Sequence, residues 1–406
     1  MGLQDTPTGE RLHIGFFGLR NAGKSSLVNA VTGQDLSVVS EVKGTTTDPV
    51  QKSMELLPLG PVVILDTPGL DDEGALGEKR VQKTKQALAK TDIAVLVVDA
   101  TAGLTDADRA FLDLLKGRPH LIAYSKADLL DTVPAETEDA IHVSAKTGLN
   151  VHALKEKIGR LAKNDAPEKR VIADLVEPGD RVVLVIPVDE SAPKGRLILP
   201  QQLVLRDLLD AHCTAICCQP QEVKATLSAL AQPPTLVVTD SQAFGAVARD
   251  VPEDILLTSF SILLARYKGV LPLLIRGAAQ LGKLQDSDTI LISEGCTHHR
   301  QCNDIGTVKL PGWIREFTGA SPKCEFTSGG EFPEDFAKYA VVLHCGGCML
   351  NAEEMRSRMK RVAASGTPVV NYGVAIAHLH GILRRSLSPF PELLKLLDES
   401  SAKSGR

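Results

Sequence analysis

The sequence predicts an α/β protein made of three units, the first of them built on a doubly wound parallel sheet. The first observation is length, because a chain of 406 residues is too long for one hydrophobic core. The second is that apolar runs of strand length alternate with helical segments, as in proteins with parallel sheets. The third is a polar stretch at residues 162–170 that is typical of a linker. We therefore expect units at residues 1–165, 171–265 and 266–406.

The overall charge argues against nucleic acid or an anionic membrane as the main partner. The 45 lysine and arginine residues against 50 aspartate and glutamate residues give a net charge of −5, which offers no general attraction to phosphates. No segment approaches the ~18 apolar residues that span a membrane, and the N-terminus lacks an apolar signal core. We therefore expect a cytoplasmic protein with no nucleic-acid or membrane partner.

A phosphate-binding loop follows the first predicted strand, at residues 13–17. Residues 18–25 read GLRNAGKS, the G-x-x-x-x-G-K-S pattern, and a helical run begins at Leu27. Its glycines let backbone N–H groups turn toward phosphate at the N-terminus of that helix. Lys24 would then reach the β- and γ-phosphates, and the Ser25 hydroxyl would bind Mg²⁺. A chance glycine loop is the alternative.

A carboxylate for the same metal is expected after the apolar run at residues 61–65. That run ends in Asp66, which can hold a water of Mg²⁺, and Gly69, whose N–H can contact the γ-phosphate. A threonine-rich stretch between the two motifs supplies Thr45 and Thr46, which can close on the metal.

Two further buried strands, at residues 93–98 and 120–124, complete this unit. The second leads into Ser-Lys-Ala-Asp at residues 125–128, and Ser-Ala-Lys follows at residues 144–146. Since parallel strands end at one edge of a sheet, these motifs are expected to surround one ligand.

This ordered set resembles the TrmE–Era branch of the translation-factor-type GTPases across the first unit. The resemblance implies that Asp128 binds the guanine N1 and N2 hydrogens and so selects GTP, with Mg²⁺ beside the phosphates. Ser125 is a departure, because the family usually has Asn there, and nucleotide affinity is expected to be weaker. The residues that the resemblance places at the nucleotide are Asn21, Ala22, Gly23, Lys24, Ser25, Ser26, Thr45, Thr46, Asp66, Gly69, Ser125, Lys126, Asp128, Ser144, Ala145 and Lys146.

Two residues bear on the rate of hydrolysis. Leu70 stands where a Ras-like enzyme places a water-orienting glutamine, and it cannot perform that task. Asn21 stands where related GTPases place an asparagine that helps to bind K⁺, which can stabilise developing charge. The alternative is that Asn21 only closes the loop. The residues expected to carry hydrolysis are Asn21, Lys24, Ser25, Thr46 and Asp66.

The middle region reads as a second, smaller α/β unit without recognisable chemistry. Strands are expected at residues 182–187 and 235–238, with a helix at residues 203–212 between them. Cys213, Cys217 and Cys218 lie here, but their spacing does not fit a ligand set, and we interpret them as small buried core residues.

The C-terminal region carries a different site. Five of the eight cysteines lie between residues 296 and 348, and in a reducing cytosol such clustering favours metal or redox chemistry over disulfides. Strands expected at residues 289–293, 339–343 and 368–370 each end in a polar loop, and parallel strands would bring these loops into one crevice. A helix expected to begin near Asn351 would lower the pKa of the preceding thiols.

Several kinds of site fit these residues. A Cys-x-x-Cys pair after a strand is also typical of a thioredoxin-like redox pair or of structural zinc, which would suit a Cys₃His set. His298 and His344 are either ligands or packed, hydrogen-bonded side chains.

The spacing is more specific when both loops are taken together. Cys296-x-His298, followed after 45 residues by His344-Cys345-x-x-Cys348, resembles the HydF family, the maturation GTPases of FeFe-hydrogenase. The resemblance covers essentially the whole chain in the order GTPase, dimerisation domain and iron–sulfur cluster domain.

The resemblance implies that Cys296, Cys345 and Cys348 hold a 4Fe–4S cluster with one exchangeable iron. The candidates for the fourth ligand are His298, His299, His344 and Asn303. The resemblance also implies a homodimeric scaffold that assembles a di-iron precursor with two radical-SAM maturases and delivers it to the FeFe-hydrogenase apoprotein. The alternative functions are a TrmE- or Era-like GTPase acting on RNA, with structural zinc, and a non-catalytic, metal-responsive GTP-binding switch.

Overall fold

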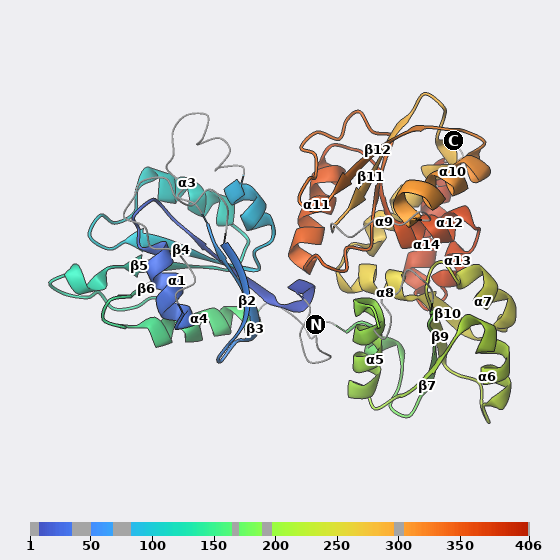
Figure 1. Cartoon of the computed structure of the whole chain (residues 1–406), viewed down its shortest axis with the longest axis horizontal. Helices are drawn as coiled ribbons and strands as arrows, with labels where there is room; N and C mark the ends of the chain where they lie inside the picture. The colour runs from blue at the N-terminus through green and yellow to red at the C-terminus, as the bar shows by residue number, and fades with distance from the viewer. Residues whose placement is uncertain are drawn as a thin grey trace. The chain divides into compact units, whose positions relative to one another are not determined.

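The computed structural model of the protein describes residues 8–34, 50–67, 83–164, 170–188, 197–295 and 304–404. It divides the chain into two compact units, residues 1–167 and 168–406, whose elements are labelled in Figure 1. The α/β class predicted from the sequence is confirmed, since three sheets with mainly parallel strands alternate with helices along the chain. Within the part of the chain that the structure describes, none of the helices combines the length and hydropathy that crossing a membrane would require.

The first unit is built on a six-stranded sheet with the order β2-β3-β1-β4-β5-β6. Strand β2 runs antiparallel to β3, and the other neighbours run parallel. The strands are β1 (Leu12–Phe17), β2 (Val50–Leu56), β3 (Gly60–Asp66), β4 (Ile93–Asp99), β5 (His120–Ser125) and β6 (Ala140–His142). Sequence analysis missed β2, because this edge strand is largely exposed and has no continuous apolar run.

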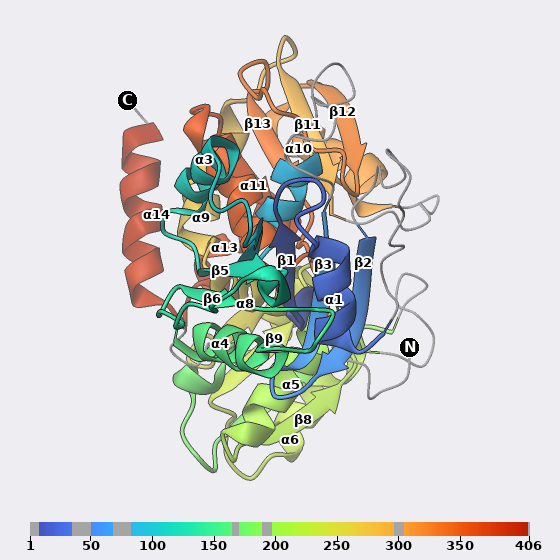
Figure 2. The same cartoon turned by 90° about the vertical axis from the view of Figure 1, so that its left-hand side faces the viewer.

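Helices cover both faces of this sheet, which makes it doubly wound as predicted. The helices are α1 (Lys24–Thr32), α3 (Asp106–Leu115) and α4 (Val151–Asn164). Successive strand residues point to opposite faces, so Ile14 and Phe16 join a core with α1 and α4, whereas Phe17 joins a core with α3. Figure 2 shows this unit turned toward the viewer, with both α1 and α4 labelled.

The second unit contains two four-stranded parallel sheets that have the same topology. Their orders are β10-β9-β7-β8 and β12-β11-β13-β14. In each sheet the first strand in the chain lies between the second and the third, and the fourth lies outside the third. The strands are β7 (Arg181–Val185), β8 (Thr214–Cys218), β9 (Leu236–Thr239), β10 (Leu256–Ser259), β11 (Thr289–Glu294), β12 (Lys323–Ser328), β13 (Val341–His344) and β14 (Val369–Asn371).

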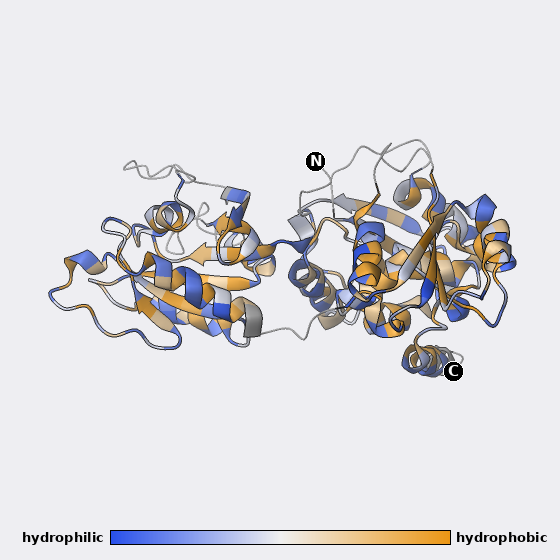
Figure 3. Cartoon of the chain, turned by 90° about the horizontal axis from the view of Figure 1, so that it is seen from below, coloured by the Kyte–Doolittle hydropathy of each residue, from blue (hydrophilic) through white to orange (hydrophobic). Residues whose placement is uncertain are grey.

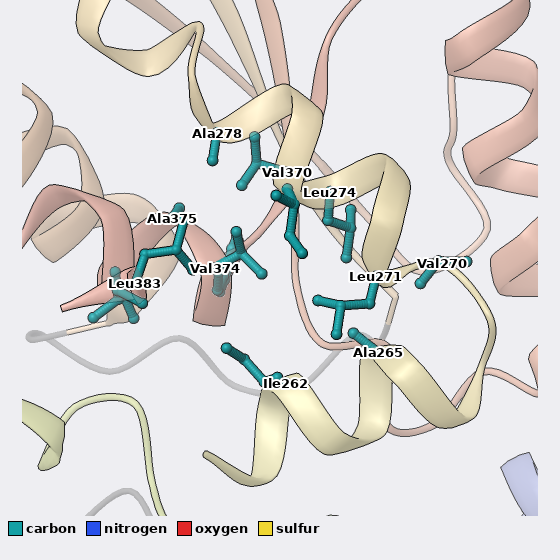
Figure 4. Packing of buried hydrophobic residues seen from close by; sticks show 14 of the residues in the cluster. Ile262, Ala265, Val270, Leu271, Leu274, Ala278, Val370, Val374, Ala375 and Leu383 are labelled. Carbon is teal, nitrogen blue, oxygen red and sulfur yellow. The ribbon is translucent and has the colours of Figure 1, made fainter. Parts of the chain in front are cut away.

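One hydrophobic cluster joins these two sheets. The helices of the unit are α5 (Leu199–Asp210), α6 (Val223–Ala229), α7 (Phe244–Asp250), α8 (Phe260–Tyr267), α9 (Leu271–Ala278), α10 (Leu310–Thr318), α11 (Ala352–Ala364), α12 (Tyr372–Leu379), α13 (Leu383–Ser386) and α14 (Pro391–Ser404). Figure 4 shows Ile262 of α8, Leu271 and Leu274 of α9, Val370 of β14 and Val374 of α12 in this cluster. The segments on either side of the predicted boundary at residues 265 and 266 therefore share one core.

The middle sheet corrects one expectation. Cys213 is buried, at 7% exposure, but Cys217 is exposed on strand β8, so the interpretation of all three cysteines here as core residues is wrong. Strand β8 itself was missed because it lies at the sheet edge and all of its residues are exposed or half-buried. In Figure 3 the central strands of each unit are hydrophobic, whereas hydrophilic residues colour the outer faces of many helices.

Candidate functional site

The loop between β1 and α1 has the backbone expected of a phosphate-binding loop. Gly18, Asn21 and Gly23 have φ angles of 146°, 59° and 82°. A Cβ at Gly18 would lie 2.1 Å from the Val97 carbonyl oxygen, so this position admits only glycine. Helix α1 begins at Lys24, so the loop ends where free N–H groups favour an anion.

Lys24, Ser25 and Asp66 meet at the end of this loop. The Lys24 ammonium donates to the carbonyl oxygens of Gly18 at 2.9 Å and Leu19 at 2.6 Å. The Ser25 hydroxyl donates to the Asp66 carboxylate at 3.0 Å, across 41 residues, because β1 and β3 are neighbouring strands. A hydroxyl and a carboxylate are the hard oxygen ligands that Mg²⁺ prefers, so these residues fit that metal.

Ser125 connects the Ser-Lys-Ala-Asp segment to the phosphate-binding loop. Its side chain is 4% exposed, and its hydroxyl lies 2.5 Å from the Ala22 carbonyl oxygen and 3.1 Å from the Val98 carbonyl oxygen. The hydroxyl thus makes a direct contact between the two loops without the amide that the related GTPases have at this position.

Asp128 is oriented by Ser144. The Ser144 hydroxyl donates to the Asp128 carboxylate at 2.6 Å. This hydrogen bond, helped by a backbone N–H and Lys146, lowers the pKa of Asp128 below its usual value despite some desolvation. The carboxylate is therefore ionised at neutral pH and can accept hydrogen bonds from a base. Lys126, with a φ of 58°, donates to Asp99 at 2.6 Å.

A cavity of about 500 Å³ brings other predicted residues together. Its walls are formed by Ser26, Asn29, Ala30, Gly33, Gln34, Ala145 and Lys146. Helix α1 and the loop after β6 therefore face a common space. Four residues expected at the nucleotide or its hydrolysis, Thr45, Thr46, Gly69 and Leu70, lie outside the described residues.

The second candidate site lies at the carboxyl edge of the sheet that contains β11, β13 and β14. These strands are parallel, as expected, and Ser293 pairs with His344, which pairs with Asn371. Their following loops therefore begin side by side. The residues from 296 to 303, which include Cys296, His298 and Cys302, lie outside the described residues.

The sulfur of Cys345 accepts two backbone hydrogen bonds. The N–H of Gly295 lies 3.0 Å from this sulfur and that of Gly347 lies 3.4 Å from it. Such donors stabilise a thiolate and tune the potential of a cluster that it binds. Helix α11 begins at Ala352, as predicted, after Asn351 caps it by accepting a hydrogen bond from the Glu354 N–H at 2.9 Å.

His344 is fully buried, and both of its ring nitrogens contact the protein. Nδ1 donates to the Cys345 carbonyl oxygen at 2.8 Å, and Nε2 lies 3.2 Å from the Arg358 guanidinium. Burial, then the charge of Arg358, lowers the pKa of His344 to about 3, so the ring is neutral. Arg358 is itself held by Glu354 at 2.8 Å. Of the two interpretations of His344, the packed, hydrogen-bonded side chain agrees with this geometry, since metal binding at Nε2 would require Arg358 to move.

The described residues fit part of a thiolate site. Among them, no group of three or more His, Cys, Asp or Glu side chains is arranged to hold a metal. Cys345 and Cys348 are present, and Cys296 is the next residue after Gly295, which contacts the Cys345 sulfur. Thiolates suit iron–sulfur clusters and zinc. Cys324 pairs with Ile290 near the opposite end of β11 and therefore lies away from this edge.

Three family models match consecutive parts of the chain. A model described as a 50S ribosome-binding GTPase matches residues 13–126. Models described as the hydrogen maturase F dimerization domain and the hydrogen maturase F tetramerization domain match residues 171–269 and 272–389. The region that sequence analysis associated with a cluster is thus matched by a model named for tetramerization.

The curated relatives match a shorter part of the chain. The tRNA modification GTPase MnmE of Streptococcus pyogenes serotype M28 is 33% identical over 163 residues, which are 39% of this chain and 35% of the relative. MnmE of Nitrosospira multiformis is 35% identical over 155 residues, or 36% and 34% of the two chains. The chain therefore spans about a third of the length of these relatives.

Solved GTPases are also similar. A probable GTP-binding protein EngB is 25% identical with a TM-score of 0.30, over 37% of this chain and 97% of that one. Aquifex aeolicus Era bound to GDP and AlF₄⁻ is 20% identical with a TM-score of 0.34, over 59% and 97% of the two chains.

Two serine substitutions should separate loop closure from base recognition. Ser125→Ala removes the hydrogen bond to Ala22, so affinity for GTP and inosine triphosphate should fall alike, about two- to twelvefold, since one hydrogen bond contributes about 0.5–1.5 kcal/mol. Ser144→Ala removes the hydrogen bond that orients Asp128. The affinity for GTP should therefore fall more than the affinity for inosine triphosphate, which lacks the 2-amino group. Titration calorimetry with both nucleotides measures this. Equal losses for both nucleotides in Ser144→Ala would show that Ser144 only supports the fold.

Proposed function

We propose that this chain, which belongs to the hydrogen maturase F family, is a GTPase that serves as scaffold and carrier in FeFe-hydrogenase maturation. It assembles the precursor of the di-iron subcluster on or beside a 4Fe–4S cluster, with help from two radical-SAM maturases, and delivers it to the apo-hydrogenase. The observation that carries this proposal is that two hydrogen maturase F domain models follow a GTPase model along one chain.

The proposed nucleotide chemistry is supported by the geometry of the first unit. Lys24 would contact the β- and γ-phosphates, Ser25 and Asp66 would hold Mg²⁺, and Asp128 would bind guanine, while Thr46, outside the described residues, is expected to close on the metal. Mg²⁺ supplies charge that stabilises the transferred phosphoryl group. The hydrogen bond from the Ser25 hydroxyl to the Asp66 carboxylate, at 3.0 Å, supports the assignment of both residues to Mg²⁺.

The proposed cluster ligands are Cys296, Cys345 and Cys348. Backbone N–H groups aimed at the Cys345 sulfur, and the start of α11 shortly after Cys348, support thiolates in this loop. A cluster bound here supplies an iron site for exchangeable ligands. His344 takes a supporting position, in which Arg358 fixes its ring beside Cys345.

An RNA-directed GTPase with structural zinc is the rival function. The tRNA modification GTPases match only 36–39% of this chain, and residues 171–269 and 272–389 match the hydrogen maturase F models. The net charge of −5 offers no general attraction to RNA. These observations favour the maturation function.

Self-association is part of the proposal, because the two matched domains are named for dimerization and tetramerization. Strand β8 is one edge of the middle sheet. The Thr214 N–H donates to Asp180 at 2.8 Å and the Cys218 carbonyl accepts from Ile186 at 2.9 Å, so these residues face β7. Since alternate residues of a parallel strand face opposite neighbours, Cys217 presents its N–H to the outside.

The other edge of that sheet is covered by the chain itself. The Ser388 hydroxyl accepts a hydrogen bond from the Leu257 N–H of β10 at 3.2 Å, and the Thr258 hydroxyl donates to the Ser386 carbonyl oxygen at 2.8 Å. We therefore assign the dimer contact to β8, which offers backbone groups to a second copy.

Potassium should accelerate GTP hydrolysis. Turnover should be slow and faster in K⁺ than in Na⁺ at fixed Mg²⁺, because Asn21 stands at the cation position and Leu70 cannot orient water. Asn21→Gly keeps the positive φ of 59° but removes the side-chain ligand, so it should abolish the difference between salts. Lys24→Ala should stop turnover in both. Phosphate-release assays that show equal wild-type rates in the two salts would remove the potassium proposal.

Loss of the thiolates should remove iron without affecting GTP turnover. After anaerobic reconstitution, Cys296→Ala, Cys345→Ala or Cys348→Ala should each lose most bound iron, whereas Cys324→Ala, away from the site, should retain it. GTP turnover should persist in all four variants, because the first unit has its own cores. Metal and sulfide analysis decides the matter. Two results would contradict the scaffold function. One is full iron content in a variant that has all three cysteines replaced by Ala, and the other is one zinc per chain without labile sulfide in the wild-type protein.

A proline on β8 should weaken self-association. Cys217→Pro removes an outward N–H and leaves the bonds of Thr214 and Cys218 to β7 in place. We expect the dissociation constant, measured by light scattering of the full chain, to rise at least tenfold, whereas Cys217→Ser behaves as the wild type. An unchanged assembly in Cys217→Pro would exclude β8 as the dimer edge.

A further inference from the structure

We propose that Lys268 is a positioning residue for the cysteine loop, which we define as residues 345–350. Its ammonium group binds two backbone carbonyl oxygens of this loop and places a positive charge on the segment that carries the proposed ligands Cys345 and Cys348. The inference rests on the proposed cluster function and names a residue that supports it.

Lys268 contacts the loop from a distant part of the chain. It directly follows helix α8, and its side chain is 1% exposed. Nζ donates to the carbonyl oxygens of Gly347 and Leu350, the latter at 2.8 Å, across 79 and 82 residues of sequence. Both acceptors are backbone atoms, so the contact fixes the path of the loop and not one side chain.

The loop needs such support because of its composition. Gly346 and Gly347 separate the two cysteines, and Gly347 has a φ of 60°. Glycine loses more conformational freedom on ordering than any other residue, so two in succession make an ordered loop costly. The Leu350 N–H donates to Gly347 at 3.0 Å and closes a turn. Lys268 bonds to the carbonyl oxygens of the same two residues and thereby stabilises that turn.

Burying the ammonium group of Lys268 costs desolvation free energy, and the need to fill space in the core does not by itself account for a lysine here. Removing an ammonium group from water costs several kcal/mol unless polar partners replace the water. A methionine would fill similar space without that cost. The hydrogen bonds to the two loop carbonyl oxygens offset part of this desolvation cost. The positive charge would also stabilise negative thiolates in the same loop.

Arg358, a second buried cation near the loop, differs from Lys268 because it is paired with a carboxylate. Arg358 forms an ion pair with Glu354 at 2.8 Å and contacts His344, so its charge is largely balanced. The ammonium group of Lys268 instead contacts the backbone of the loop itself. A positive charge near a cluster favours the more negative, reduced state and so raises its reduction potential.

Lys268 also connects two matched domains. It lies in the segment matched by the dimerization model, residues 171–269, whereas the cysteine loop lies in the segment matched by the tetramerization model, residues 272–389. Its hydrogen bonds therefore carry any displacement of α8 directly to the loop that bears Cys345 and Cys348.

Two substitutions separate position from charge. Lys268→Met removes both hydrogen bonds and the charge, whereas Lys268→Gln keeps a donor for a carbonyl oxygen but lacks the charge. Lys283→Met, at an exposed position, is the control. Three quantities are measured: amide hydrogen exchange at Leu350 in the metal-free protein, iron and sulfide per chain after reconstitution, and the midpoint potential from an electron paramagnetic resonance titration.

In Lys268→Met we expect exchange at Leu350 to accelerate at least tenfold, bound iron to fall at least twofold, and the potential of the remaining cluster to decrease. Lys268→Gln should show slower exchange than Lys268→Met but the same decrease in potential, and Lys283→Met should match the wild type. Wild-type exchange and potential in both Lys268 variants would overturn the proposal. If wild-type protein binds no iron–sulfur cluster, the proposed function fails, while exchange in the metal-free protein still decides whether Lys268 anchors the loop.

Discussion

Both candidate sites depend on the fact that parallel strands end together at one edge of a sheet. Ser25 and Asp66 are 41 residues apart, and Gly295 and Cys345 are 50 residues apart, yet each pair is in hydrogen-bond contact. In each case the two residues lie at or after the ends of neighbouring parallel strands, β1 with β3 and β11 with β13. The sheet thus supplies the proximity, and the loops need only supply the chemistry.

The second unit shows how one topology serves two purposes. Its two sheets have the same strand order, but Cys345 and Cys348 lie in the loop after the inner strand β13, whereas Cys217 and Cys218 lie within the edge strand β8 of the middle sheet. At the corresponding edge of the middle sheet, the Ser241 and Ser261 hydroxyls lie 2.5 Å apart, and a Cβ at Gly373 of α12 would lie 2.0 Å from Ser261 Oγ. Here the polar side chains are used in packing between the sheets. The shared core also brings the end of α8, and with it Lys268, to the cysteine loop.

Sequence patterns predicted what is local and buried. The phosphate-binding loop, the inner strands of the first sheet and the start of α11 follow from motifs and apolar runs that lie within a few residues of one another. Edge strands β2, β8 and β12 were missed, because exposed side chains give them no apolar run. The contact of Ser125 with Ala22 spans 103 residues, and that of Lys268 with the cysteine loop about 80, so no local pattern indicates them. His344 was predicted from the sequence as either a metal ligand or a packed side chain. Its contact with Arg358, which only the structure shows, favours the packed side chain.

The two candidate sites offer donor atoms of opposite character. Hydroxyl and carboxylate oxygens at Ser25 and Asp66 suit a hard cation, whereas the thiols at Cys345 and Cys348 suit iron. Each compact unit has its own hydrophobic cores, so neither site relies on the other for its shape. Under the proposed function, a nucleotide influences the cluster site by binding two states of the chain with different affinity. By the same linkage, a bound cluster would alter nucleotide affinity by an equal factor. Under the proposed function, coupling between nucleotide and cluster is therefore expected to act through assembly and partner binding.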